Sequence, residues 1–289
     1  VCAEDLDNST LNQVNGNDNS SSILSNSAEN VIGDNLEEIT VNNWDELQYY
    51  CYLNDGNYVL KLKENTNFYP TDVDDVSYQI QVNNNVTIIG SSGAYFGDAS
   101  ANARSIKYLA ISVSENSGHG ITLKNVTFKW ISSKFEPNAI FLQMGGNVTN
   151  TVENCIFNNI SMTGGHSSIL HIMKGDVVLT NCSFTNCTTD FGCLSVYNPD
   201  DDPTALCTRA RGEVNNCYFE GNYARTEPGC INNCGILVVR NSTFYRNAAF
   251  WWAGAIHTHG GANTTIYDSN FTDNVAGWNG GALYTYSYL

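Results

Sequence analysis

The sequence predicts an all-β protein, a single-stranded parallel β-helix (solenoid) with a short N-terminal cap. First, six segments share the pattern aliphatic-x-Asn-x-x-Phe, with Asp in place of Asn in the last of them. Second, a further short strand begins eleven or twelve residues after five of the six Phe and nine residues after Phe184. Third, no amphipathic helix separates these strands, which excludes both βαβ units and helical repeats. The chain therefore coils so that each copy lies on the previous one.

The repeated segments set the length of one coil. The phenylalanines are separated by 29, 27, 35, 25 and 27 residues, and Asn85 to Ile88 forms an earlier, degenerate copy, which makes about seven copies. The six complete segments run from Leu123 to Phe128, Val152 to Phe157, Leu179 to Phe184, Val214 to Phe219, Val239 to Phe244 and Ile266 to Phe271. The second strands begin at Ala139, Ile169, Cys193, Cys230, Ala255 and Ala282.

Stacked coils bring equivalent residues into columns with a spacing of about 4.8 Å. Each Phe and the position two residues before it share one face of a strand, so we expect both to point inward and the Phe column to form the spine of the core. Asn tolerates the left-handed backbone of a tight corner, and its amide can bond to the Asn one coil away. The Asn ladder predicted at this corner consists of Asn125, Asn154, Asn181, Asn216 and Asn241.

The chain divides into three predicted parts. Residues 1–37 form a flexible leader rich in Asn and Ser, and Val1-Cys2-Ala3 has the form of a residual signal-peptide end. Residues 38–80 form the N-terminal cap, with a strand followed by a short helix that Asn43 or Asp45 caps. Residues 81–289 hold the β-helix repeats, and we expect these to continue beyond Leu289 because a solenoid end without a polar cap leaves its core and edge open.

Composition and charge narrow the function classes. The formal net charge of −16 and the pI near 4.4 disfavour nucleic-acid backbones and anionic lipid as partners. No stretch approaches the roughly 20 apolar residues of a membrane helix. Ten cysteines behind a signal-like start favour an oxidising compartment. We therefore expect an exported, extracellular protein.

Later repeats resemble a known family. Phe219-Glu220-Gly221-Asn222, Phe244-Tyr245-Arg246-Asn247 and Phe271-Thr272-Asp273-Asn274 are similar to the Phe-x-x-Asn half of the repeats in polymorphic outer-membrane proteins, and Gly280-Gly281-Ala282-Leu283 is similar to their Gly-Gly-Ala-Ile half. With the Asn-rich leader, the chain from about residue 38 onward resembles the adhesin-like surface proteins of methanogenic archaea. This resemblance implies a right-handed β-helix, location at the cell surface and attachment to other cells. It implies no catalytic residues.

The cysteines occupy two inward columns. Cys155 and Cys182 stand two residues before the Phe, and Cys193 and Cys230 occupy equivalent positions in consecutive copies. Stacked Cα atoms fall within the disulfide range of about 4.4 to 6.8 Å, so these four residues are the disulfide candidates, with Cys193 and Cys230 as the preferred pair. A zinc site at Cys230 and Cys234 lacks a second matching pair, so structural disulfides or buried thiols are favoured.

The outer face of the second strand is the candidate ligand-binding surface. Aligning the copies places aromatic and imidazole side chains on this face and in the turn before it, with no carboxylate among them. Flat aromatic rings can stack on sugar rings, whereas glycosidic cleavage needs acidic residues. His257 and His259 point the same way and could bind a metal, but no third ligand is evident, so neither a metal nor another cofactor is predicted. The candidates are Phe141, His171, Tyr197, His257, His259, Tyr284, Tyr286, Trp251, Trp252 and Trp278.

These features favour an extracellular cell-surface adhesin without catalytic residues. Its expected partners are glycans or proteins on the surface of other cells, with membrane or wall attachment only through a region after Leu289. One alternative is a β-helix polysaccharide lyase or glycoside hydrolase, for which the acidic insertion 198–212 offers Asp residues. The other is a structural stalk or envelope filament component. Aromatic stacking could equally be packing within the protein.

Overall fold

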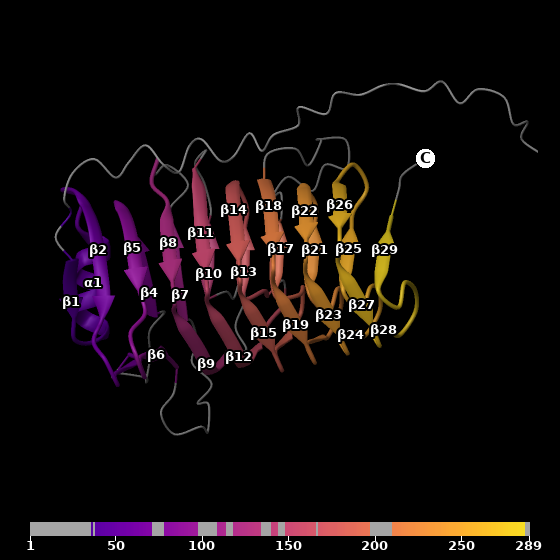
Figure 1. Cartoon of the computed structure of the whole chain (residues 1–289), viewed down its shortest axis with the longest axis horizontal. Coiled ribbons are helices and arrows are strands. Elements are labelled where there is room, and N and C mark those ends of the chain that lie inside the picture. The colour runs from indigo at the N-terminus through magenta and orange to yellow at the C-terminus, as the bar shows by residue number, and fades with distance from the viewer. Residues whose placement is uncertain are drawn as a thin grey trace, which may run out of the picture. The chain divides into compact units, whose positions relative to one another are not determined.

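A computed structural model describes residues 36, 38–70, 78–97, 109–113, 118–133, 140–143, 148–165, 167–196 and 210–286. The chain separates into two compact units, Val1–Leu36 and Glu37–Leu289. The first unit lies almost wholly outside the described residues, as does the predicted leader. The second unit is a parallel β-solenoid, and all of its described strand pairs are parallel (Figure 1).

Three sheets run along the solenoid, and each coil contributes to all three (Figure 1). In spatial order the first sheet consists of β1 (Glu38–Val41), β2 (Asn57–Leu62), β5 (Asn85–Ile89), β8 (Ile121–Lys124), β11 (Thr149–Glu153), β14 (Gly175–Thr180), β18 (Ala210–Asn215), β22 (Ile236–Arg240) and β26 (Asn263–Tyr267). The second consists of β4 (Tyr78–Val82), β7 (Leu109–Val113), β10 (Phe141–Gln143), β13 (Leu170–Ile172), β17 (Leu194–Val196), β21 (Ile231–Asn233), β25 (Ile256–Thr258) and β29 (Leu283–Thr285).

The third sheet contains the Phe segments. It begins with β3 (Asn67–Phe68), β6 (Tyr95–Phe96), β9 (Thr127–Ser133) and β12 (Ile156–Met162). From β12 it continues as two rows, because each later coil bends between two short strands. One row is β15 (Ser183–Thr185), β19 (Tyr218–Glu220), β23 (Thr243–Tyr245) and β27 (Asn270–Thr272), and the other is β16 (Thr188–Thr189), β20 (Tyr223–Ala224), β24 (Ala248–Ala249) and β28 (Val275–Ala276). The predicted parallel β-helix is thereby confirmed.

A helix packs at the N-terminal end of the coils. Helix α1 (Trp44–Tyr52) follows β1, and the Asn43 side chain caps it by accepting a bond from the Glu46 N–H over 2.9 Å. Its buried residues Trp44, Leu47 and Cys51 face the coil interior. The helix covers the end of the core in this way, as the strand-then-helix pattern predicts. In the described part of the chain no helix is long and apolar enough to cross a membrane.

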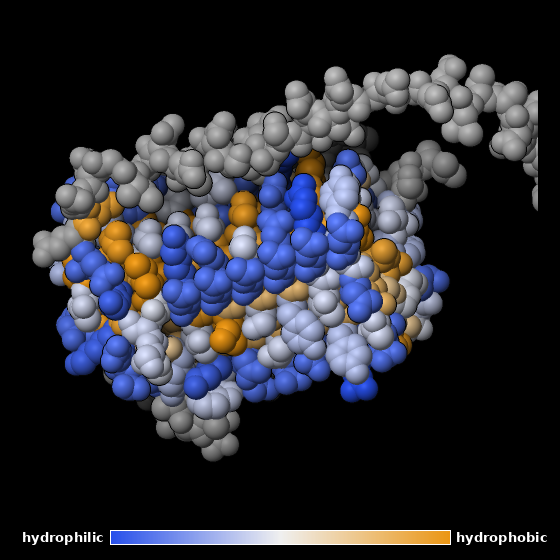
Figure 2. All heavy atoms as spheres, viewed as in Figure 1, coloured by the Kyte–Doolittle hydropathy of each residue, from blue (hydrophilic) through white to orange (hydrophobic). Residues whose placement is uncertain are grey.

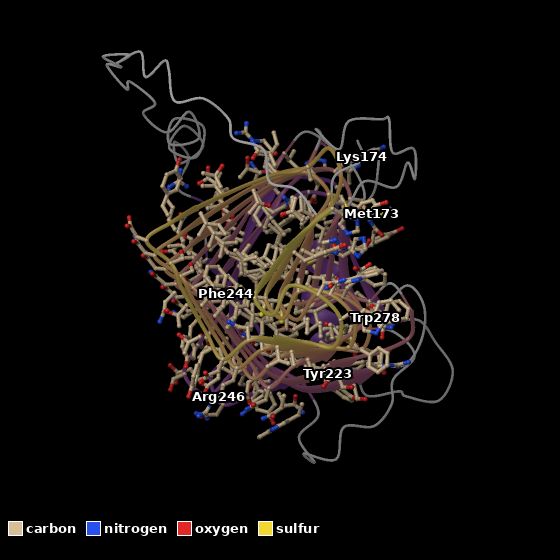
Figure 3. The ribbon with its side chains drawn as sticks, turned by 90° about the vertical axis from the view of Figure 1, so that its right-hand side faces the viewer. Met173, Lys174, Tyr223, Phe244, Arg246 and Trp278 are labelled. Carbon is tan, nitrogen blue, oxygen red and sulfur yellow. The ribbon has the colours of Figure 1, made fainter. Side chains whose placement is uncertain are left out.

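A column of stacked phenylalanines forms the core. Neighbouring rings from Phe96 to Phe271 lie 4.5 to 5.0 Å apart, and the rings from Phe128 onward are nearly parallel. Figure 3, seen from the end at which β29 lies, places Phe244 inside the coils and Arg246 at the outside. The predicted Phe column is confirmed, and it extends two coils further back, through Phe96 to Phe68.

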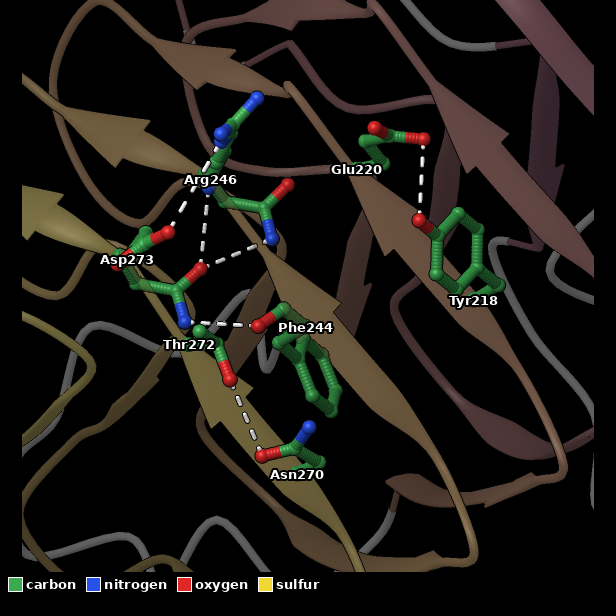
Figure 4. Close-up of polar contacts among 9 residues, drawn as sticks. Tyr218, Glu220, Phe244, Arg246, Asn270, Thr272 and Asp273 are labelled. Carbon is green, nitrogen blue, oxygen red and sulfur yellow. Dashed lines mark hydrogen bonds and ion pairs between the residues drawn. The ribbon is translucent and has the colours of Figure 1, made fainter.

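A second Asn ladder, not predicted from the sequence, lies inside the coils. Asn222 and Asn247 are fully buried. Asn222 Nδ2 donates to Asn247 Oδ1, and Asn247 Nδ2 donates to Asn274 Oδ1, each over 3.0 Å. Asn274 Nδ2 also donates to the Phe244 carbonyl over 2.9 Å, and Figure 4 shows this carbonyl with a dashed line to its donor. The Phe-x-x-Asn motif thus supplies an internal amide column that satisfies its own polar atoms.

The predicted Asn column lies at an outer corner. Asn125, Asn154, Asn181, Asn216 and Asn241 all have left-handed backbones, with φ between 48° and 56°, and Asp268 continues the series at 46°. These side chains are exposed, and Asn181 Nδ2 donates to Asn154 Oδ1 over 3.1 Å. Figure 2 shows a band of hydrophilic side chains across the coils between the first and third sheets. The corner Asn therefore serves the backbone turn.

The cysteine columns form as predicted, but the disulfides do not. The candidates Cys155, Cys182, Cys193 and Cys230 are buried and form no disulfide. Residues in register on parallel strands point the same way, so their Cβ atoms stay about 4.8 Å apart, beyond the roughly 3.5 to 4.5 Å of a disulfide. Cys155 and Cys182 bond to carbonyls instead, as Cys182 Sγ does to Val152 O over 3.3 Å.

Replacing one ring of the Phe column should destabilise the fold. Phe184→Ala removes a fully buried ring that stacks on Phe157 and Phe219, so we expect the free energy of unfolding to fall by about 3 to 5 kcal/mol in urea denaturation. The control Tyr218→Ala alters an exposed ring on the same sheet and should change it by less than about 0.5 kcal/mol. Equal effects of the two changes would contradict the Phe spine.

The two Asn columns should respond differently to mutation. Asn247→Ala leaves the Asn222 N–H without its acceptor inside the core, so we expect a loss of about 1 to 3 kcal/mol or more in the same assay. Asn241→Gly keeps the left-handed corner accessible and should cost less than about 1 kcal/mol. A larger loss for Asn241→Gly than for Asn247→Ala would contradict this division of roles.

The free thiols can be counted directly. In guanidinium without reductant, we expect a colorimetric thiol titration to detect at least seven thiols, those of Cys51, Cys155, Cys182, Cys187, Cys193, Cys217 and Cys230. In the native protein these thiols should react slowly because they are buried, and burial raises the pKa of Cys51 to about 12. Fewer than seven thiols in the unfolded chain would show that at least one of these seven cysteines is oxidised.

Candidate functional site

The turn that precedes the second sheet carries a cluster of aromatic side chains. The rings of Trp251 and Trp252 lie 5.7 Å apart, and each lies 6.0 Å from Trp278 of the next coil. Trp252 also stacks on Tyr284 at 6.0 Å, with only 12° between the ring planes. Trp278 is 67% exposed, and Figure 3 shows it at the periphery of the coils. We call these four residues the aromatic cluster.

The rings of the aromatic cluster come together because successive turns stack directly on one another. The Trp278 N–H donates to the Trp251 carbonyl over 2.8 Å, and the Trp251 N–H donates to the Thr226 carbonyl over 3.0 Å. Gly254 follows the tryptophans, at a point where the next coil approaches closely. A side chain would not fit there, since a Cβ atom would clash with the Gly281 carbonyl oxygen. The glycine lets the two turns, and hence their rings, come into contact.

Behind the aromatic cluster lies a buried polar group. His257 of β25 is only 3% exposed, and its ring lies 5.1 Å from Tyr284 and 6.2 Å from Trp252. Glu227, in the turn between β20 and β21, is 9% exposed. Its Oε2 lies 2.9 Å from His257 Nδ1. His257 therefore sits between a carboxylate and the aromatic rings.

His259 completes this group. Its ring centroid is 4.0 Å from that of His257, and its Nε2 lies 2.8 Å from Asn232 Oδ1. Burial, followed by the neighbouring His257, lowers the pKa of His259 to about 4, so its imidazole is neutral at physiological pH. The ligand atoms of Glu227, His257 and His259 all lie within 4.8 Å of one another. This set of a carboxylate and two imidazoles can bind a metal ion or handle a proton.

Asp190 holds Glu227 and the two residues that precede it. The Asp190 carbonyl accepts from the Glu227 N–H over 3.3 Å and from the Thr226 hydroxyl. Its buried carboxylate accepts from the N–H groups of Gly164 and Gly165 and pairs with Arg225 at 3.5 Å. These contacts satisfy Asp190, so we assign it a structural role that holds Glu227 in place.

The expectation that this face lacks a carboxylate is wrong. Glu227 stands two residues before Gly229, as Trp252 stands before Gly254 and Asn279 before Gly281, so the three share a column. Aligning the repeats by their tryptophans does not reveal this column, because its residue is Glu, Trp or Asn in successive coils. The recurring glycine is the signal that locates Glu227.

The structure brings together six of the ten predicted face residues, namely Trp251, Trp252, Trp278, His257, His259 and Tyr284. The prediction that the column of His257 forms an outer face is wrong, because His257 is buried and so are its column neighbours Asn232 and Ser195. Tyr286 lies at the same end and is 44% exposed. His171 belongs to the column of His257, through Ser195 and Asn232, but three coils away. Tyr197 lies outside the described residues, as does most of the insertion 198–212.

Phe141 was placed in the wrong column. It pairs with Leu170, whereas Leu142 pairs with His171. The second strand of that coil therefore starts one residue later than the sequence alignment assumed, and side chains on a strand change face with every residue.

Comparison with known proteins identifies the fold family. A family model described as "right handed beta helix region" matches residues 109–288, which is more than half of the chain. No curated protein matches the sequence.

Proposed function

Because the chain belongs to the right-handed β-helix family, we propose that it is an extracellular cell-surface adhesin that binds glycans through the aromatic cluster. The fold is compatible both with adhesion and with enzymes that act on polysaccharides. The resemblance of its repeats to adhesin-like surface proteins of methanogenic archaea supports the first of these functions. Its partners would be glycans, or proteins, on the surface of other cells.

The observation that carries this proposal is the contact between aromatic rings of successive turns. Each of the four rings has its centroid 5.7 to 6.0 Å from that of at least one other ring, and Trp278 is largely exposed. Such rings offer flat apolar faces on which sugar rings can stack. Isolated exposed aromatics are ordinary, whereas a contiguous group marks an interaction surface. The net charge of −16 favours neutral or cationic glycans over polyanionic ones.

A polysaccharide lyase or hydrolase is the second candidate, and Glu227 is the observation that favours it. Cleavage of a polysaccharide needs two carboxylates, or a carboxylate and a basic group, that converge on one site. Glu227 and His257 meet this requirement at 2.9 Å, directly behind the aromatic cluster. This candidate predicts turnover of a bound glycan, which adhesion does not.

A glycan and polysaccharide array with a cleavage assay of every retained glycan tests the proposal. We expect retention without cleavage, weakened about fivefold or more by Trp252→Ala, taking the roughly 1 to 3 kcal/mol that one aromatic ring contributes when it stacks on a nucleobase as the guide. Tyr49→Ala, which changes a 60% exposed ring on α1, is the matched control and should leave retention unchanged.

Three other outcomes of this experiment would contradict the proposal. Cleavage that disappears in Glu227→Gln would establish the enzyme and refute the adhesin. Retention that is the same in Trp252→Ala as in the native protein would refute the aromatic cluster as the binding surface. Absence of retention across the array would favour a structural role or a protein partner.

A further inference from the structure

We propose that Glu227, His257 and His259 form a binding site for a divalent transition-metal ion of the Zn²⁺ class. The three side chains come from two successive coils, in the turn before β21 and on or beside β25. Their ligand atoms lie within 4.8 Å of one another, which is close enough for a single ion to contact all three after small side-chain movements. This inference does not rest on glycan binding.

The strongest support comes from polar atoms that are buried without hydrogen-bond partners. Glu227 Oε2 and both ring nitrogens of His257 lack a hydrogen bond, although both residues are more than nine-tenths buried. Glu227 Oε2 and His257 Nδ1 are 2.9 Å apart, but their orientation does not make a hydrogen bond. Buried polar groups are almost always paired. Glu227 Oε2 and the lone-pair nitrogen of His257 can each donate an electron pair to one ion, while the other ring nitrogen of His257 carries the proton, so these unpaired acceptors indicate a ligand that is a metal cation.

The chemistry of the donors selects the type of ion. Two imidazole nitrogens and one carboxylate oxygen form a common ligand set for Zn²⁺ at sites that keep a further position open for water or substrate. Imidazole also suits the other late first-row divalent ions. Ca²⁺ and Mg²⁺ prefer oxygen ligands, whereas two of the three ligands here are imidazole nitrogens.

Neighbouring residues hold the ligands in place before an ion arrives. Asn232 Oδ1, 2.8 Å from His259 Nε2, accepts a hydrogen bond from the Nε2–H tautomer, which leaves Nδ1 with its lone pair. Asp190 fixes the backbone of Thr226 and Glu227. Trp252 and Tyr284 cover the His257 ring. Such outer contacts are typical of a metal site, whose ligands need fixed orientations.

Calorimetric titration of chelator-treated, metal-free protein with zinc tests the site. We expect one equivalent to bind, and Glu227→Gln and His257→Ala each to weaken binding by more than about 100-fold, since removal of an outer partner alone costs roughly 10 to 100-fold. The matched controls are His171→Ala, in the same column three coils away, and Glu213→Gln, on β18. Both should bind zinc as the native protein does.

Cobalt as a spectroscopic substitute distinguishes this site from the buried cysteines. We expect visible absorption bands of a nitrogen and oxygen site, without a thiolate charge-transfer band. Glu227→Gln preserves the shape of the side chain, and circular dichroism checks the fold of every variant, with His259→Gln replacing His257→Ala if the latter fails to fold. The absence of zinc binding, unchanged affinity in Glu227→Gln or a thiolate band would each overturn the proposal.

Discussion

In-register parallel stacking of the coils is the constraint on which the other features depend. Each residue has its equivalents one coil above and below as neighbours, at a spacing of about 4.8 Å. Side chains must therefore be able to stack on copies of themselves. Phenylalanine does so with rings 4.5 to 5.0 Å apart, and asparagine does so because its amide both donates and accepts. Cysteine fits the same space without forming the disulfide that its sequence position suggests.

Columns that repeat one residue type, such as Phe or Asn, stabilise the solenoid. The candidate functional groups lie where a column changes residue type from coil to coil. Glu227, Trp252 and Asn279 occupy one column and differ in every coil. Such a break places the Glu227 carboxylate next to the imidazoles and the Trp252 indole of the following coil. The buried Asn ladder satisfies its hydrogen bonds, whereas the Glu227 and His257 group leaves three atoms unpaired, each at a cost of about 1 to 3 kcal/mol. Other polar atoms in the described residues are also buried without a hydrogen bond, but here they belong to a group of two imidazoles and a carboxylate within 4.8 Å of one another, and this marks the place as a candidate functional site.

The aromatic cluster and the buried polar group form one continuous region. His257 contacts both, through the rings of Trp252 and Tyr284 on one side and through Glu227 on the other. A ligand that stacks on the rings would lie directly over the polar group. Glycan binding, metal binding and polysaccharide cleavage are therefore alternative or combined uses of a single location, and each produces a different measurable signal.

The sequence by itself determined the coil, the cap and the inward columns. The spacing of Phe, the alternation along each strand and the capping Asn43 are local properties, so they can be recognised without knowledge of the fold. The aromatic turn was recognised in the same way. Only the tertiary structure decided the column of Phe141, the burial of the Phe-x-x-Asn amides and the presence of Glu227 behind the tryptophans. The reason is physical: coil lengths range from 25 to 35 residues, so positions far from the Phe anchor depend on the path of the backbone through the turns, where side-chain direction follows no period.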